Sequence, residues 1–243
     1  MTTTTAALFA VGALLVGFSK TSIGGIASIA VAIFASLMPA RESTAAILLL
    51  LITGDVVAVW HYRRHADWAL LRRLVPAVLP GLVLGAAFLA VVDDTVLRRS
   101  IGGLLLLLSL LQLWLSRRSE PLRAAHGRWF AASTGLAAGF TTMTANAAGA
   151  VMTLYLVARG VDKHRFLGTN ATFFLGINLC KLPFSAGLGL FGPGTLTRTA
   201  LLAPLVLIGA WAGLHTARRL SQHHFDRAVL AATVVSSLAL LVH

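Results

Sequence analysis

The stretch Gly17-Phe18-Ser19-Lys20-Thr21-Ser22-Ile23-Gly24-Gly25 interrupts a long apolar segment with glycine, hydroxyl and lysine side chains. A second interruption, Gly139-Phe140-Thr141-Thr142-Met143-Thr144-Ala145-Asn146-Ala147-Ala148-Gly149, begins 122 positions later and opens in the same way. Glycine-interrupted apolar segments at corresponding positions of two halves are typical of membrane proteins whose solute-binding site lies between internal repeats.

The composition predicts a chain that resides in lipid. Of the 243 residues, 57% are hydrophobic and 12% are charged, whereas a soluble domain carries about 25% charged residues. Several apolar runs approach or exceed the roughly 18 residues that mark a membrane helix. The fold class expected is therefore an all-helical polytopic membrane protein, with the lipid bilayer as a partner.

The formal net charge of +12 does not predict a nucleic-acid partner. The basic residues stand almost entirely between the apolar segments, where they act as topology signals and form no separate basic face. The single cysteine, Cys180, allows no internal disulfide, and no metal-ligand spacing occurs. No metal or cofactor is expected, and the uncharged start of the chain predicts no cleaved signal peptide.

Eight apolar segments fall into two halves, 1–120 and 121–243. They cover about 5–37 (broken at 17–25), 43–61, 74–92, 100–116, 129–158 (broken at 139–149), 166–191, 199–217 and 228–242. Similar residues recur at nearly constant offset in the two halves: Arg41 with Lys163, Gly54 with Gly176, Pro80 with Pro204, and Gly85 with Gly209. The pattern predicts one transmembrane domain made of two repeats.

Two arrangements of the broken segments are considered. Residues 5–18 would form a helix of about 21 Å and residues 26–37 one of about 18 Å, and neither reaches across a hydrocarbon core of about 30 Å. Each broken segment therefore either crosses once as a kinked helix or returns as a re-entrant hairpin.

The basic residues favour the hairpins. Single crossings divide the 18 basic residues outside the segments nine against nine, whereas hairpins divide them fourteen against four. Because positive charge gathers on the cytoplasmic side, we predict two re-entrant hairpins and six full spans in a bacterial-type inner membrane, with both termini extracytoplasmic. Three spans per half make the repeats inverted, with alternating access around a midplane site.

The second helix of each hairpin is expected to begin at the tip, at Thr21–Ile26 and at Ala145–Gly149. Helix N-termini present free N–H groups and a partial positive charge, which together bind anions. The two tips therefore predict a site for a small anion near the middle of the membrane.

The chain resembles the sulfite exporter TauE/SafE family of small membrane permeases over nearly its whole length. The resemblance rests on Gly17–Gly25, the second break ending at Gly149, Gly168-Thr169-Asn170, the Asn178–Lys181 stretch and the four-plus-four arrangement of segments. It implies export of sulfite or organosulfonates, so the substrate expected is a sulfur oxyanion or organosulfonate.

Three charged residues lie inside apolar segments, where a charge is costly and marks function by default. Lys20 is predicted to contact the anion most directly, and its alternative is a lysine that reaches the interface. Lys181 is a second substrate-binding candidate, and its alternative is a structural ion pair with Asp55. Asp55 is the one carboxylate inside a segment, so it is the candidate for proton coupling or else a salt-bridge partner.

Uncharged polar groups near the two breaks complete the predicted substrate-binding set. They are Thr21, Ser22, Gly24, Gly25, Thr142, Thr144, Asn146, Asn170 and Asn178, with Thr169 as a further neighbour. The alternative for each is a helix–helix hydrogen bond. The pairs Gly81/Gly85 and Gly209/Gly213 predict close helix contacts within the chain, or alternatively a homodimer interface.

A secondary transporter of small anions is the function predicted. An anion channel uses the same pore-lining charges and stays the alternative. An intramembrane enzyme is disfavoured because no histidine lies deep in a segment, so the chain is not expected to be an enzyme.

Overall fold

The computed structural model describes residues 3–22, 26–116 and 127–219, which form helices and no strand. The elements are α1 (Thr3–Thr21), α2 (Ala27–Leu37), α3 (Ala40–Tyr62), the short 3-10 helix η2 (Arg63–His65), α4 (Trp68–Val91), α5 (Asp94–Ser116), α6 (Arg128–Ala145), α7 (Ala148–Ala158), α8 (Lys163–Gly187) and α9 (Thr195–Arg219). The predicted all-helical class is confirmed.

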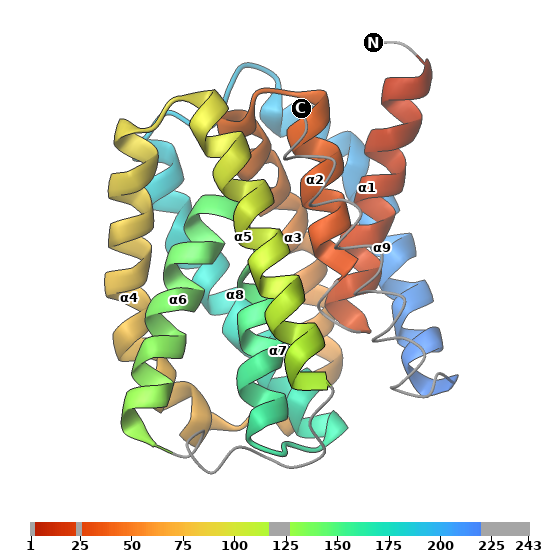
Figure 1. Cartoon of the computed structure of the whole chain (residues 1–243). Coiled ribbons are helices and arrows are strands. Elements are labelled where there is room, and N and C mark those ends of the chain that lie inside the picture. The colour runs from red at the N-terminus through yellow and green to blue at the C-terminus, as the bar shows by residue number, and fades with distance from the viewer. Residues whose placement is uncertain (1–2, 23–25, 117–126, 220–243) are drawn as a thin grey trace.

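The helices form a bundle in which α1 and α6 each turn back into a short helix. α2 packs against α1, and α7 packs against α6, in each case with the chain direction reversed (Figure 1). The longer helices α3, α4, α5, α8 and α9 run the length of the bundle (Figure 1).

Hydrogen bonds near the starts of helices mark the two ends of the bundle. At one end, the Arg41 N–H donates to Asp94 Oδ1 at 3.0 Å, which ties the start of α3 to the start of α5. At the other end, the Asp67 N–H donates to Thr169 Oγ1 at 2.9 Å, and Arg165 forms an ion pair with Asp67. The start of α8 therefore lies beside the η2 turn, away from the start of α3.

Two helix pairs make the closest contacts, and glycines permit both of them. α1 packs along α9, where a Cβ at Gly17 would overlap the carbonyl oxygen of Val206. α4 packs along α6, where a Cβ at Gly139 would overlap the carbonyl oxygen of Val78. Small residues allow such backbone approach in membrane helices. The predicted intrachain contacts of Gly81/Gly85 and Gly209/Gly213 belong to these same interfaces and are confirmed.

The interruptions are shorter than the glycine pattern predicts. α1 continues through Lys20 to Thr21 and α6 continues to Ala145, so the predicted breaks at 17–25 and 139–149 are wrong in their first halves. The physical reason is that Gly17 and Gly139 serve helix packing and do not end a helix. With 19 residues, α1 is about 28 Å long, so the predicted length of 21 Å for its first helix is also wrong.

Four helical stretches of the described residues are long and apolar enough to cross a membrane. They are Thr3–Thr21, Ala40–His65, Trp68–Val91 and Thr195–Ala217, and Ala27–Leu37 is a shorter apolar helix. The predicted last segment, 228–242, lies outside the described residues. The counts of eight segments and six spans stay predictions.

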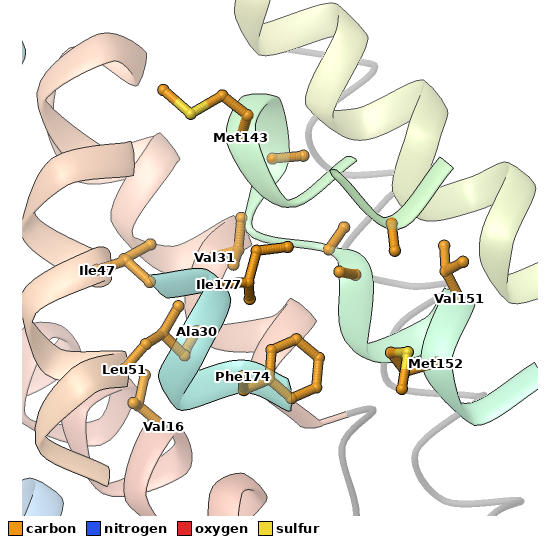
Figure 2. Packing of buried hydrophobic residues seen from close by; sticks show 14 of the residues in the cluster. Val16, Ala30, Val31, Ile47, Leu51, Met143, Val151, Met152, Phe174 and Ile177 are labelled. Atoms are coloured by element: carbon orange, nitrogen blue, oxygen red, sulfur yellow. The ribbon is translucent and has the colours of Figure 1, made fainter. Parts of the chain in front are cut away.

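The interior is one apolar cluster to which both halves of the chain contribute. Ile47 and Leu51 of α3, Met152 of α7, and Phe174 and Ile177 of α8 belong to it (Figure 2). Lipid is as apolar as these side chains, so their contacts stabilise the bundle mainly through close packing. Polar groups inside this cluster therefore need hydrogen-bond or ion-pair partners.

Candidate functional site

A buried ion pair joins the end of α1 to the middle of α3. Lys20 Nζ lies 2.7 Å from Asp55 Oδ1, and the exposed fractions of the two side chains are 9% and 0%. Lys20 stands in the last turn of α1, where the partial negative charge of the helix C-terminus also favours a cation. The α1 lysine is thus neutralised within the protein.

Three neighbours hold this pair in place. Gly54 leaves room for the lysine stem, since a Cβ there would lie 3.0 Å from Lys20 Cγ. The Phe174 ring covers the ammonium, with Nζ 4.2 Å from the ring centroid, a favourable cation–π arrangement. Asn178 Nδ2 donates to Asp55 Oδ2 at 2.7 Å. Both carboxylate oxygens of Asp55 therefore have a partner.

Lys181 is buried to 2% exposure next to this pair and has different partners. Its Nζ donates to Asn146 Oδ1 at 2.5 Å and to Thr142 Oγ1 at 3.3 Å. No carboxylate among the described residues pairs with it. Its predicted alternative role as the ion-pair partner of Asp55 is therefore wrong, because Lys20 occupies that position.

Asn146 links Lys181 to the turn between α6 and α7. Its backbone is left-handed, with φ 51° and ψ 28°, and its N–H donates to the carbonyl of Thr142 at 3.1 Å. Asparagine tolerates this conformation at a helix end better than most residues. Its Nδ2 donates to the Thr44 carbonyl at 3.1 Å, which fixes Oδ1 towards the lysine. α7 begins two residues later, so its positive N-terminus lies close to Lys181.

The cluster as described holds two lysines and one carboxylate, a formal charge of +1. Lys181 attracts Asp55 and repels Lys20 at this range. Asn178 and Lys181 lie one turn apart on α8 and share a face of that helix. The side chain of Asn178 also has a buried Oδ1 without a hydrogen-bond partner in the described part of the chain. A buried unpaired cation costs several kcal/mol, so this arrangement favours a bound anion.

Other hydroxyl candidates near the first break bond to backbone. Thr21 Oγ1 donates to the Ala210 carbonyl of α9 at 2.7 Å, and Gly213 provides the space for it. Ser22 Oγ donates to the Phe18 carbonyl at 2.6 Å. The structure thus assigns Thr21 the alternative role, a helix–helix hydrogen bond. Gly24 and Gly25 lie outside the described residues.

In the second half, the structure brings Thr142, Asn146, Asn178 and Lys181 together. Thr144 donates to the Phe140 carbonyl at 2.9 Å within its own helix. Thr169 bonds to the loop before α4 at the end of the bundle. Asn170 has a buried Oδ1 without a described partner and stands about three turns before Lys181 on α8.

Two groups that contribute to the site are not predicted from the sequence. Phe174 covers Lys20, and the Thr44 carbonyl orients Asn146. The position of Phe174, one turn before Asn178, is a signal that could have placed it on the face of α8 that carries the site. A backbone carbonyl of α3 leaves no such signal.

Comparison with protein families places the whole chain. The family model described as "Sulfite exporter TauE/SafE" matches residues 8–240. Neither the curated proteins nor the solved structures contain a match. Because the family model covers nearly the whole chain, the protein belongs to the sulfite exporter TauE/SafE family of membrane transporters.

Proposed function

We propose that this chain exports sulfite or a small organosulfonate and binds it at Lys181. The observation that carries the proposal is a fully buried ammonium whose described partners are neutral oxygens only. Family membership supports the class of substrate.

The chemistry of the site suits an oxyanion with three oxygens. A lysine ammonium has three donors, and two of them are directed to Asn146 and Thr142. The third is available for a ligand. The Thr142 hydroxyl and the first N–H groups of α7 supply further donors. Sulfite and sulfonates can accept from several of these groups at once and carry the negative charge that neutralises Lys181, which a cation or a neutral sugar lacks.

Asp55 is the proposed site of proton coupling. Protonation of Asp55 removes the negative charge that neutralises Lys20, so the cluster becomes more positive by one unit. Anion binding and proton binding therefore favour each other, and by linkage the effect is reciprocal.

Alternating access between inverted repeats is the proposed mechanism. The reversal of direction from α1 to α2 and from α6 to α7 supports two re-entrant hairpins. The interfaces α1–α9 and α4–α6 support the two-fold relation, because in each the first helix of one half packs on a late helix of the other. The end of the bundle that carries η2 is proposed to face the cytoplasm, with the termini on the opposite side.

Calorimetry on the purified protein tests the site. We expect sulfite and sulfoacetate to bind more tightly than short carboxylates. Lys181→Ala should weaken their binding by on the order of 2–5 kcal/mol, the range measured when one member of a buried charged pair is removed. The sequence predicts that Lys20→Ala weakens anion binding most. In the structure Asp55 already neutralises this lysine, so we expect Lys20→Ala to weaken binding less than Lys181→Ala does.

Arg64→Ala, which removes an exposed positive charge, is the matched control and should bind like the parent. If Lys181→Ala binds sulfite as tightly as the parent, the site is elsewhere. Flux far above the rate of a coupled carrier, with no dependence on a proton gradient, would instead identify a channel.

A further inference from the structure

A second group of buried polar atoms, at the end of α7 and on α8, lacks partners within the described residues. The atoms are the Tyr155 hydroxyl, Nε and Nη2 of Arg159, and Oδ1 of Asn170. The Tyr155 side chain is 0% exposed. We infer that these residues form a second oxyanion-binding station, on the route between the η2 end of the bundle and Lys181. This inference rests on the proposed function and deepens it.

Aromatic contacts hold the α7 part of the station. Arg159 directly follows the last residue of α7, and its N–H donates to the carbonyl of Tyr155 at 3.1 Å, so the two residues lie one turn apart on the same side. The guanidinium carbon of Arg159 lies 5.2 Å from the Tyr155 ring centroid. The Phe130 ring of α6 stacks on Tyr155 with centroids 6.0 Å apart. The two donors are therefore positioned before any ligand arrives.

The chain path places Asn170 at the same end of the bundle. α7 ends at Ala158 and α8 begins at Lys163, so Arg159 and the first turns of α8 lie near one another. Asn170 stands on the stripe of α8 that also carries Phe174, Ile177 and Lys181. Asn170 is about 16 Å from Lys181 along the helix axis.

An apolar layer separates this station from Lys181. Figure 2 shows the Phe174 ring directed towards Met152 of α7, with Ile177 beside it on α8, and all three belong to the buried cluster. Met152 lies one turn before Tyr155, and Phe174 lies one turn after Asn170. A solute that moves along this face therefore meets a polar level, then the apolar layer, then Lys181.

The chemistry of the station fits a partly protonated oxyanion. A guanidinium and a phenol donate to oxygens of the ligand. The oxygen of Asn170 accepts, so it matches the remaining proton of hydrogen sulfite. The positive charge of Arg159 also raises the local concentration of anions at this end. The station thus collects the substrate before it crosses the apolar layer.

Uptake of radiolabelled sulfite into membrane vesicles of both orientations tests the station. Arg159→Gln and Tyr155→Phe should each raise the KM for sulfite about tenfold when transport starts from the η2 end. The KM from the opposite face should stay within about twofold of the parent's, because that face reaches Lys181 first. Tyr155→Phe keeps the ring that packs on Phe130, so it preserves the fold.

Arg72→Gln is the matched control, because Arg72 is an exposed arginine near the same end and its loss changes only the surface charge. A KM that the station variants raise equally from both faces, or from neither, overturns the station. Lys181→Ala measured alongside distinguishes the two proposals: if it transports like the parent, the proposed function fails. If it abolishes transport from both faces while the station variants behave like the parent, only the station fails.

Discussion

Two buried lysines lie in one cluster, and their partners give them different roles. Lys20 has a carboxylate and an aromatic ring as partners, whereas Lys181 has an amide oxygen and a hydroxyl. The first arrangement is neutral until Asp55 takes up a proton, and the second holds a charge that a ligand completes.

Asp55→Asn should abolish the dependence of sulfite accumulation on an imposed pH gradient, because an amide neither binds nor releases a proton in this range. The single variant should also lose stability by about 3–5 kcal/mol, since it leaves Lys20 buried without a counter-ion. Proteoliposome uptake with and without a pH gradient measures the first effect, and thermal unfolding in detergent measures the second.

The double variant Lys20→Met/Asp55→Asn separates coupling from folding. It buries no charge at this position, so it should regain most of the parent's stability and still show no pH-driven accumulation. Accumulation that again follows the pH gradient in the double variant would make Asp55 a structural partner only.

At the scale of helices, glycine determines how closely α1 approaches α9 and α6 approaches α4. Gly17→Ala and Gly139→Ala should each destabilise the protein by about 1–3 kcal/mol, because the new methyl group overlaps a backbone carbonyl of the facing helix. Thermal unfolding of the purified variants measures the loss.

Gly176→Ala is the control for this comparison. It lies within α8, and a Cβ there meets nothing within 4 Å. This variant should be as stable as the parent or more stable, because alanine is the better helix former by up to about 1 kcal/mol. If Gly17→Ala unfolds at the same temperature as Gly176→Ala, the α1–α9 contact tolerates a wider spacing.

At the scale of the whole molecule, the charge distribution and the path of the helices make one topological prediction. In a Cys180→Ala background, cysteines at Thr3 and Arg41 should be labelled by an impermeant maleimide from the same, extracytoplasmic side. Cysteines at Arg64 and Asp162 should be labelled from the cytoplasm. Labelling of Thr3 and Arg41 from opposite faces would mean that the first broken segment crosses the membrane.

The sequence predicts the helical class and the polar centre because both depend on local composition. Lysine, aspartate and asparagine in apolar segments are costly wherever the helices pack, so Lys20, Asp55, Asn178 and Lys181 could be selected in advance. Which of them pair could not be predicted, because an ion pair between α1 and α3 depends on the relative rotation of two helices. For the same reason the sequence indicates a helix break at Gly17, whereas the role of this residue depends on α9, far away in the sequence.

The reciprocal packing of α1 on α9 and of α4 on α6 has a consequence for biosynthesis. α1 ends at Thr21 and α9 begins at Thr195, so the ribosome adds about 170 residues between them, which takes roughly 10–35 s at ordinary translation rates. During that interval the glycine-lined surface of α1 has lipid or an insertion factor in place of its partner. A nascent chain that stalls after α8 retains this open surface, and quality-control proteases of the membrane can distinguish it from the finished protein.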